Sequence, residues 1–252
     1  MINVIIHGCG GRMGRFVESV VNETEGYQVA AGVDPRGLEG VDYPVFTNIN
    51  DCNVKGDVII DFSNAVAVPA LLEYCKKTAT PVVLCTTGLS DEVLAQVQET
   101  SKSVAVLKSA NMSVGVNLIM NLVKKAAAEL FDIGFDIEIL EKHHNQKVDA
   151  PSGTALALAD SMNQAMDGQY AYTCDRSTRR EKRNPKEIGI SSVRGGCIVG
   201  EHDVIFAGRD EVVTLSHTAY SKAIFAKGAL EAAKFLAGKK PGMYSMTDVV
   251  DL

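Results

Sequence analysis

Short apolar runs alternate with amphipathic stretches through the first part of the chain. The runs lie at 4–6, 28–33, 58–60, 82–84 and 104–107. Runs of this length are typical of strands buried on both faces, and apolar residues recurring every three or four positions between them predict helices. The pattern therefore predicts a Rossmann-like parallel sheet covered by helices on both faces, within an α/β fold.

The pattern changes after position 112. A long helix is expected around 118–130, and then Phe135, Ile137 and Ile139 alternate with acidic residues, which predicts a strand with one exposed face. Further strands are expected at 188–194, 198–206 and 211–216. These elements predict an α+β domain with an open, mostly four-stranded mixed sheet, whose uncovered face favours self-association.

A last helix at 222–237 carries an apolar face that is expected to pack on the first domain. The predicted organisation is a dinucleotide-binding domain formed by 1–112 with 219–252, and a substrate-binding and oligomerisation domain at 113–218.

The first strand leads into HGCGGRMG, in which Gly8, Gly11 and Gly14 are evenly spaced before a helix. Glycines at such a turn let the backbone approach a pyrophosphate, which the helix amides then face. The loop residues expected to contact a dinucleotide are Gly8, Cys9, Gly10, Gly11, Arg12 and Met13.

Asp34 ends the second strand, at a suitable distance to accept hydrogen bonds from an adenosine ribose. The alternative is an ordinary turn residue before Pro35. A carboxylate here repels a 2'-phosphate and favours NADH, whereas Arg36 can pair with that phosphate and admit NADPH. We expect NADH to be favoured and NADPH to be tolerated.

Polar segments follow three of the other strands. Ligands of such sheets bind outside the carboxyl ends of the strands, so these segments are expected to line the nicotinamide end of the site, although each also suits an ordinary loop. The residues concerned are Phe62, Cys85, Thr86, Thr87, Ser109, Ala110, Asn111 and Met112.

The sequence EKHHNQKVDAPSGTA at 141–155 collects cationic candidates just before a helix start. His143, His144 and Lys147 can carry positive charge, and Ser152 stands at a helix-cap position. Gly153 and Thr154 then form the first turn, whose amides can bind an anion. The segment indicates a small, strongly anionic substrate. Adjacent histidines could also bind zinc, but their spacing is not i, i+4 and no cysteine lies nearby in sequence, so no metal is expected.

The charge of −6 argues against nucleic acid as a partner. The N-terminal residues show no basic region followed by a long apolar core, so neither a signal peptide nor a membrane partner is expected. Six cysteines without CxxC spacing indicate reduced thiols and a cytoplasmic protein. The basic segment 176–186 suits a solvated loop or a charge-complementary subunit contact.

The chain resembles the bacterial dihydrodipicolinate reductases of lysine and diaminopimelate biosynthesis over nearly its whole length. The resemblance rests on GCGGRMG, DFS at 61–63, TTG at 86–88, NMSVGVN at 111–117, HHNQKVDAPSGTA, and RGGCIVGEHDVIF at 194–206. It implies NAD(P)H-dependent reduction of 4-hydroxy-tetrahydrodipicolinate, a small cyclic dicarboxylate, to 2,3,4,5-tetrahydrodipicolinate by a homotetramer.

By the same resemblance, the substrate carboxylates are held by His144, Lys147, Gly153 and Thr154, and the proton donors are His143 and Lys147. Two positions depart from the family pattern. Cys85 replaces the usual glycine before the threonine pair, and Met112 replaces a common aromatic residue. Both departures bear on cofactor preference and affinity.

Two other functions are compatible with the first domain. A dehydrogenase of an open-chain amino acid or semialdehyde would share it but would not need the segment from His143 to Thr154. A regulatory NAD(H) sensor would bind the cofactor without turnover and would give Lys147 no role.

Overall fold

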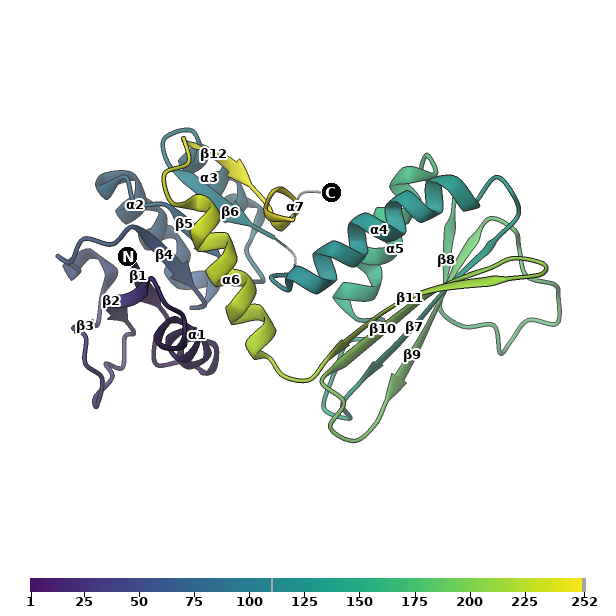
Figure 1. Ribbon diagram of the computed structural model, residues 1–252, viewed down its shortest axis with the longest axis horizontal. Helices are drawn as coiled ribbons and strands as arrows, with labels where there is room; N and C mark the ends of the chain where they lie inside the picture. The colour runs from purple at the N-terminus through teal and green to yellow at the C-terminus, as the bar shows by residue number, and fades with distance from the viewer. Residues whose placement is uncertain (110, 251–252) are drawn as a thin grey trace. The chain divides into compact units, whose positions relative to one another are not determined.

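A computed structural model describes residues 1–109 and 111–250. The chain divides into two compact units, with residues 1–114 and the segment from Lys222 onward in unit 1 and Gly115–Ser221 in unit 2. Figure 1 shows the elements of each unit, which are described separately below. No helix within the described residues is long and apolar enough to cross a membrane.

Unit 1 contains a seven-stranded sheet in the order β12-β6-β5-β4-β1-β2-β3, with every neighbouring pair parallel. The strands are β1 (Ile2–His7), β2 (Tyr27–Val33), β3 (Val45–Phe46), β4 (Val58–Asp61), β5 (Val82–Leu84), β6 (Ala105–Lys108) and β12 (Gly242–Tyr244). The five apolar runs are strands, as predicted. The additional β3 and β12 are only two and three residues long and extend the sheet at its two edges.

Helices cover both faces of this sheet. They are α1 (Arg12–Glu23), α2 (Val68–Thr78), α3 (Asp91–Ser101), α6 (Ala223–Leu236) and α7 (Met246–Val249), with short 3-10 turns at Ile49–Asp51 and Ala65–Ala67. Successive strand residues point to opposite faces, so Ile6 packs in one core with α1 and α6, whereas Ile5 packs in another with α2 and α3. Helix α6, predicted at 222–237, therefore packs on the first unit, as its apolar face predicts.

Unit 2 contains a five-stranded mixed sheet in the order β11-β10-β7-β9-β8. Its strands are β7 (Asp136–His143), β8 (Ala171–Thr173), β9 (Glu187–Arg194), β10 (Gly200–Ala207) and β11 (Val212–Ala219), and its helices are α4 (Val114–Leu130) and α5 (Gly153–Ala165). The four predicted strands are present, and the three-residue β8 adds a fifth at one edge.

One face of this sheet packs against α4 and α5. Ile137 and Ile139 of β7 share a core with Phe206 of β10 and with residues of both helices, including Leu158. The opposite face is partly open, with Val212 61% exposed. The alternation of apolar and acidic residues along β7 therefore has the predicted meaning of one buried and one accessible face.

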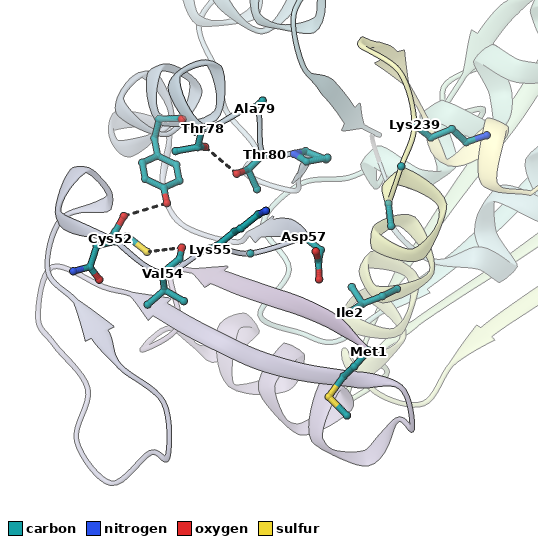
Figure 2. Close-up of a pocket in the computed structure, with 16 residues that line it drawn as sticks. Met1, Ile2, Cys52, Val54, Lys55, Asp57, Thr78, Ala79, Thr80 and Lys239 are labelled. Atoms are coloured by element: carbon teal, nitrogen blue, oxygen red, sulfur yellow. Dashed lines mark hydrogen bonds between the residues drawn. The ribbon is translucent and has the colours of Figure 1, made fainter.

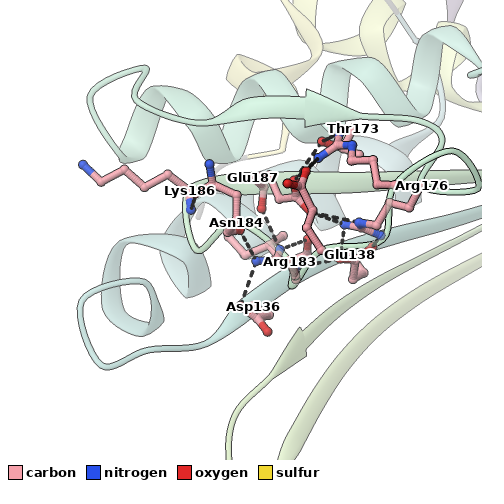
Figure 3. A network of polar contacts seen from close by, with 11 residues as sticks. Asp136, Glu138, Thr173, Arg176, Arg183, Asn184, Lys186 and Glu187 are labelled. Atoms are coloured by element: carbon pink, nitrogen blue, oxygen red, sulfur yellow. Dashed lines mark hydrogen bonds and ion pairs between the residues drawn. The ribbon is translucent and has the colours of Figure 1, made fainter.

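The basic segment before β9 folds back on the acidic residues of this sheet (Figure 3). Arg176 Nη2 lies 2.7 Å from Glu138 Oε1 and 2.7 Å from Glu187 Oε1. Arg183 Nη1 lies 2.8 Å from Asp136 Oδ1, and its Nε lies 2.9 Å from Glu138 Oε1. Two arginines of the segment are therefore paired with acidic strand residues of their own unit, so this part of it is not a freely solvated loop.

Candidate functional site

The glycine loop after β1 has the geometry of a phosphate-binding turn. Gly8 adopts φ +86°, and a Cβ there would lie 2.7 Å from the Phe62 carbonyl oxygen. A Cβ on Gly14 would overlap the Gly8 carbonyl, so this glycine lets α1 approach the strand closely. Helix α1 begins at Arg12 after the N-cap Gly11, and no side chain of the described residues caps it. These features fit a dinucleotide pyrophosphate at the helix amides.

Asp34 closes this loop on the other side. Its Oδ2 accepts a hydrogen bond from Gly10 N at 3.1 Å, and its Oδ1 accepts from Arg36 N at 3.1 Å and Arg36 Nε at 3.2 Å. Burial raises the pKa of Asp34, but the bonds from Arg36 and Gly10 outweigh it, so the pKa lies below its usual value. The carboxylate is 4% exposed, whereas the Arg36 side chain is 74% exposed. Asp34 thus stabilises the turn after β2, which is the alternative that the sequence offered for it. Its ion pair also holds the Arg36 guanidinium at the end of this strand.

A buried polar group joins the carboxyl ends of three central strands. Asp61 Oδ1 lies 2.7 Å from His7 Nδ1, and Asp61 Oδ2 accepts from Thr86 Oγ1 at 2.6 Å. The Ser63 amide also donates to Asp61 Oδ1 at 3.2 Å. Thr86 is therefore buried and fixed, while its neighbour Thr87 is exposed. The sequence placed Asp61 in a segment expected to line the nicotinamide end, but it did not reveal the role of Asp61 in holding Thr86. His7 was not expected in the site, although a polar residue directly after an apolar run could have indicated it.

The remaining predicted cofactor residues differ in accessibility. Cys9 is fully buried and its thiol has a pKa raised to about 11, chiefly by burial. Cys85 is partly buried, and burial together with the nearby Asp61 carboxylate raises the pKa of its thiol well above the usual value. Met112 is 4% exposed and belongs to the core shared with α6.

Asn111 Oδ1 accepts a hydrogen bond from the Ser113 amide at 2.8 Å, which shapes the turn before α4. Phe62 and Ser109 are half-buried. Ala110 lies outside the described residues.

The second candidate site is built on the end of β7. His143 is the last residue of this strand, and its Nδ1 lies 2.6 Å from Glu141 Oε2. Glu141 is fully buried and accepts hydrogen bonds from both terminal nitrogens of Arg194. Nη1 donates to Oε2 at 2.8 Å, and Nη2 donates to Oε1 at 2.7 Å. The sheet register places Arg194 opposite His143 on β9. A Cβ on Gly200 would lie 3.1 Å from His143 Nε2, so the glycine leaves room beside this atom.

The start of α5 is attached to the same carboxylate. Ser152 N donates to Glu141 Oε1 at 3.1 Å, and Ser152 Oγ accepts from Ala155 N at 3.1 Å, which makes Ser152 the predicted helix cap. The same oxygen is hydrogen-bonded to His202 Nε2, 3.0 Å away. The His202 ring meets His143 edge-on, with centroids 5.1 Å apart.

The loop between β7 and α5 carries the other predicted residues. Lys147 Nζ lies 2.7 Å from Asp149 Oδ1, and the Lys147 amide donates to the carbonyl of His144 at 3.1 Å. The hydrogen bond from Lys147 lowers the pKa of Asp149 below its usual value, and the Gly153 amide lowers it further to a smaller extent. Gly153 is exposed, and a Cβ there would meet nothing within 4 Å. The structure thus brings His143, Lys147 and the first turn of α5 together around one polar segment.

The charges in this site are set by burial and by the arginine. Burial raises the pKa of Glu141, but hydrogen bonds from Arg194 and His143 among others lower it to about 2, so the group is ionised at neutral pH. Burial lowers the pKa of His143 against the opposing effect of Glu141. An ionised Glu141 accepts a hydrogen bond from His143 Nδ1–H, and this leaves His143 Nε2 as the atom that can exchange a proton.

A cavity of about 690 Å³ lies elsewhere, at the amino ends of β1, β4 and β5 (Figure 2). Its lining includes Met1, Lys55, Asp57, Thr80 and Lys239, and none of the predicted site residues. Among the described residues, no group of three or more His, Cys, Asp or Glu side chains is arranged to hold a metal ion.

Comparisons with known proteins identify the family of this chain. The family model described as dihydrodipicolinate reductase, N-terminus, matches residues 2–112, and the C-terminus model matches residues 115–250. The chain belongs to the dihydrodipicolinate reductase family.

Individual relatives of this reductase family match over nearly the full length. The 4-hydroxy-tetrahydrodipicolinate reductase of Caldanaerobacter subterraneus subsp. tengcongensis is 52% identical over 250 residues, covering 99% of this chain and 98% of the relative. That of Clostridium novyi is 49% identical with the same coverage. The dipicolinate-bound dihydrodipicolinate reductase from Paenisporosarcina sp. TG-14 superposes with a TM-score of 0.84 at 26% identity, covering 100% of both chains.

Stability is expected to fall below neutral pH because His202 is buried in its neutral form. Burial lowers the pKa of His202 from 6.5 to about 4, so its contribution is complete above about pH 6.5 and is lost as the pH falls toward 4. Between pH 7 and pH 5 this residue should cost about 2 kcal/mol of unfolding free energy. Burial also lowers the pKa values of His143 and His217, which act in the same direction.

Urea unfolding at both pH values checks this expectation, with His202→Gln compared against the unmodified chain. The variant should lose less stability between pH 7 and pH 5. An identical loss in both proteins would show that His202 does not titrate as described.

Proposed function

We propose that this chain is a 4-hydroxy-tetrahydrodipicolinate reductase, which uses NADH or NADPH to form 2,3,4,5-tetrahydrodipicolinate in diaminopimelate and lysine biosynthesis. The observation that carries the proposal is the segment from His143 to Thr154. In this segment His143 and the start of α5 are both bonded to the buried Glu141 carboxylate, and Lys147 lies in the loop between them. The chain is a member of the dihydrodipicolinate reductase family. The reaction consumes a hydride and a proton and releases water.

Unit 1 is proposed as the NAD(P)-binding domain, corresponding to residues 1–112 with 219–252. The glycine loop is proposed to offer the α1 amides to the pyrophosphate, and Asp34 with Arg36 is proposed to meet the ribose; the uncapped start of α1 and the Arg36–Asp34 pair at the end of β2 support this. Phe62, Thr86, Thr87 and the segment 109–112 are proposed to flank the nicotinamide. The bound dinucleotide supplies the hydride.

Unit 2, corresponding to residues 113–218, is proposed to hold the dicarboxylate. Lys147, His144 and the Gly153 and Thr154 amides supply positive charge and hydrogen-bond donors at one helix start. The Paenisporosarcina relative is described as binding dipicolinate, an aromatic dicarboxylate, which supports this assignment. Lys147 is paired with Asp149, and a substrate carboxylate would take over part of that pairing.

His143 and Lys147 are proposed as the proton donors. Hydride addition to a conjugated imine builds negative charge on the ring, and a positioned acid that neutralises it contributes roughly 10²- to 10⁴-fold in rate. His143 can donate through Nε2, because Nδ1 is bonded to Glu141. No step is assigned to a metal.

Lys147→Ala is expected to lower kcat/KM by about 10²- to 10⁴-fold while cofactor binding is retained. The measurement follows NADH and NADPH oxidation with substrate generated by condensing pyruvate and aspartate semialdehyde with the preceding synthase. Lys102→Ala removes an exposed lysine of the α3 end, paired with Glu99, and serves as the control for charge loss.

The same assay separates this proposal from its alternatives. Cofactor binding without turnover by the unmodified chain would instead indicate an NAD(H) sensor. Turnover of an open-chain substrate that survives Lys147→Ala would indicate a different dehydrogenase.

We propose that NADH is favoured and NADPH tolerated. Arg36 is exposed at the end of β2 beside Asp34, where a 2'-phosphate would be drawn to the guanidinium and repelled by the carboxylate. Arg36→Gln should therefore raise KM for NADPH by about 10-fold, as expected for loss of a charge-assisted hydrogen bond, and change KM for NADH much less. Initial rates with each cofactor decide it. An equal rise for both cofactors would mean that Arg36 acts through the loop and not through the phosphate.

The assembly is proposed to be a cytoplasmic homotetramer formed through the open face of the unit 2 sheet. The support is the exposed apolar residues of this face, such as Val193 at 44% and Val212 at 61%, and the six free cysteines, which suit a reducing compartment. Sedimentation equilibrium should give about four times the 27.0 kDa chain mass. Val212→Lys on the open face should then shift the distribution to smaller species, and a monomeric unmodified chain would rule out this assembly.

A further inference from the structure

Glu141 has more partners than a structural ion pair requires. Its Oε2 is bonded to His143 Nδ1 and Arg194 Nη1, and its Oε1 is bonded to Ser152 N and Arg194 Nη2. The carboxylate is completely buried, and these four contacts lie between 2.6 and 3.1 Å. Two different functional parts, the His143 ring and the start of α5, are therefore attached to the two oxygens of one group.

We propose that Glu141 is a positioning residue, which fixes the proton-donating ring of His143 relative to the carboxylate-binding start of α5. This inference rests on the proposed function. A substrate held by the α5 amides can receive a proton from His143 only if the ring and the helix start keep their separation. Misplacement of a catalytic group by about 1 Å can cost roughly 10²-fold in rate.

The carboxylate also sets the charge of His143. The groups that face His143 are Glu141 on its own strand, Arg194 on β9, His202 on β10 and Lys147 in the following loop. Burial lowers the pKa of His143 most, Glu141 raises it, and Lys147 and Arg194 lower it further. Removal of the Glu141 charge would leave the imidazolium facing two cations, so its pKa should fall further.

Arg194 keeps Glu141 itself out of the proton exchange. With both oxygens receiving the guanidinium, the pKa of Glu141 is about 2, so it stays ionised when His143 changes its protonation. A proton given up by His143 Nε2 is then replaced from outside the pair, while Nδ1 keeps its bond to Glu141. The arrangement selects one tautomer of His143.

The test is Glu141→Gln, which keeps the side-chain shape and removes the charge. We expect kcat/KM to fall by about 10- to 100-fold. Any limb of the pH profile that requires protonated His143 should move to lower pH. Nitrogen NMR of ring-labelled histidine in the substrate-free protein should show a lower His143 pKa and a smaller preference for the Nδ1–H tautomer.

Glu138→Gln is the matched control. Glu138 lies on the same strand, is paired with Arg176 and Arg183, and belongs to the opposite face, so it tests the loss of a carboxylate–arginine pair alone. His143 titration should be unchanged in this variant. If Glu141→Gln does not fold because Arg194 is left unpaired, the double variant Glu141→Gln with Arg194→Met removes both charges. Because Arg194 itself lowers the pKa of His143, the double variant is expected to show a smaller downward shift than Glu141→Gln, together with the same loss of preference for the Nδ1–H tautomer.

The outcomes separate this inference from the proposed function. A turnover-competent chain in which Glu141→Gln leaves both kcat/KM and the His143 titration unchanged would overturn the positioning role and leave the reductase assignment intact. Absence of turnover in the unmodified chain would overturn the reductase assignment, whereas the NMR titration would still show whether Glu141 orients His143. Rescue of the titration by Glu141→Asp would support a role of the charge.

Discussion

The paired charge of Glu141 and Arg194 is the interaction on which unit 2 depends. An ionised carboxylate with no exposed surface is costly to bury unless hydrogen bonds replace its hydration. Here both terminal nitrogens of Arg194 donate to the carboxylate oxygens, and the Ser152 amide and the His143 ring are among the further partners. Because these partners come from β7, β9 and the start of α5, satisfying one charge draws three segments into register.

The two candidate sites are proposed to bind anions by different physical means. In unit 1 the helix α1 begins after glycines, so the backbone amides themselves face the ligand and little side-chain charge is needed. In unit 2 the first turn of α5 is already capped by Ser152, and cations from the preceding loop supply the attraction. The chain carries a net charge of −6, so any affinity for anions must come from local arrangements such as these.

The regular elements were largely predictable because local pattern and final environment agree. The five continuous apolar runs are strands buried on both faces, and Ser152 before an apolar helical face is a cap. The short strands β3, β8 and β12 were not predicted, because they carry neither a period nor a continuous run of strongly apolar residues like that of the equally short β5, and they lie at existing sheet edges. The residues expected to contact cofactor and substrate stay predictions, since their roles concern ligands.

The polar residues that support the site escaped prediction for a related reason. Glu141 lies an even number of residues from Ile137 and Ile139 along β7, so its side chain points to the same, buried face of the sheet. What makes a buried glutamate tolerable is Arg194, 53 residues later, and nothing local reveals that pairing. Asp61 with His7 is the same case, because the two residues are 54 positions apart and meet through strand pairing.

In both units, then, the candidate catalytic and binding residues lie in recognisable local motifs, whereas the residues that hold them in place lie on neighbouring strands. The sheet supplies this support because parallel strands bring their carboxyl ends to one edge whatever their separation in sequence. Thr86 is fixed by Asp61 from the adjacent strand β4, and His143 is fixed by a carboxylate that Arg194 holds from the adjacent strand β9. A buried acidic residue near the end of a strand, next to a functional motif, is therefore better explained as support for that motif than as a second reactive group.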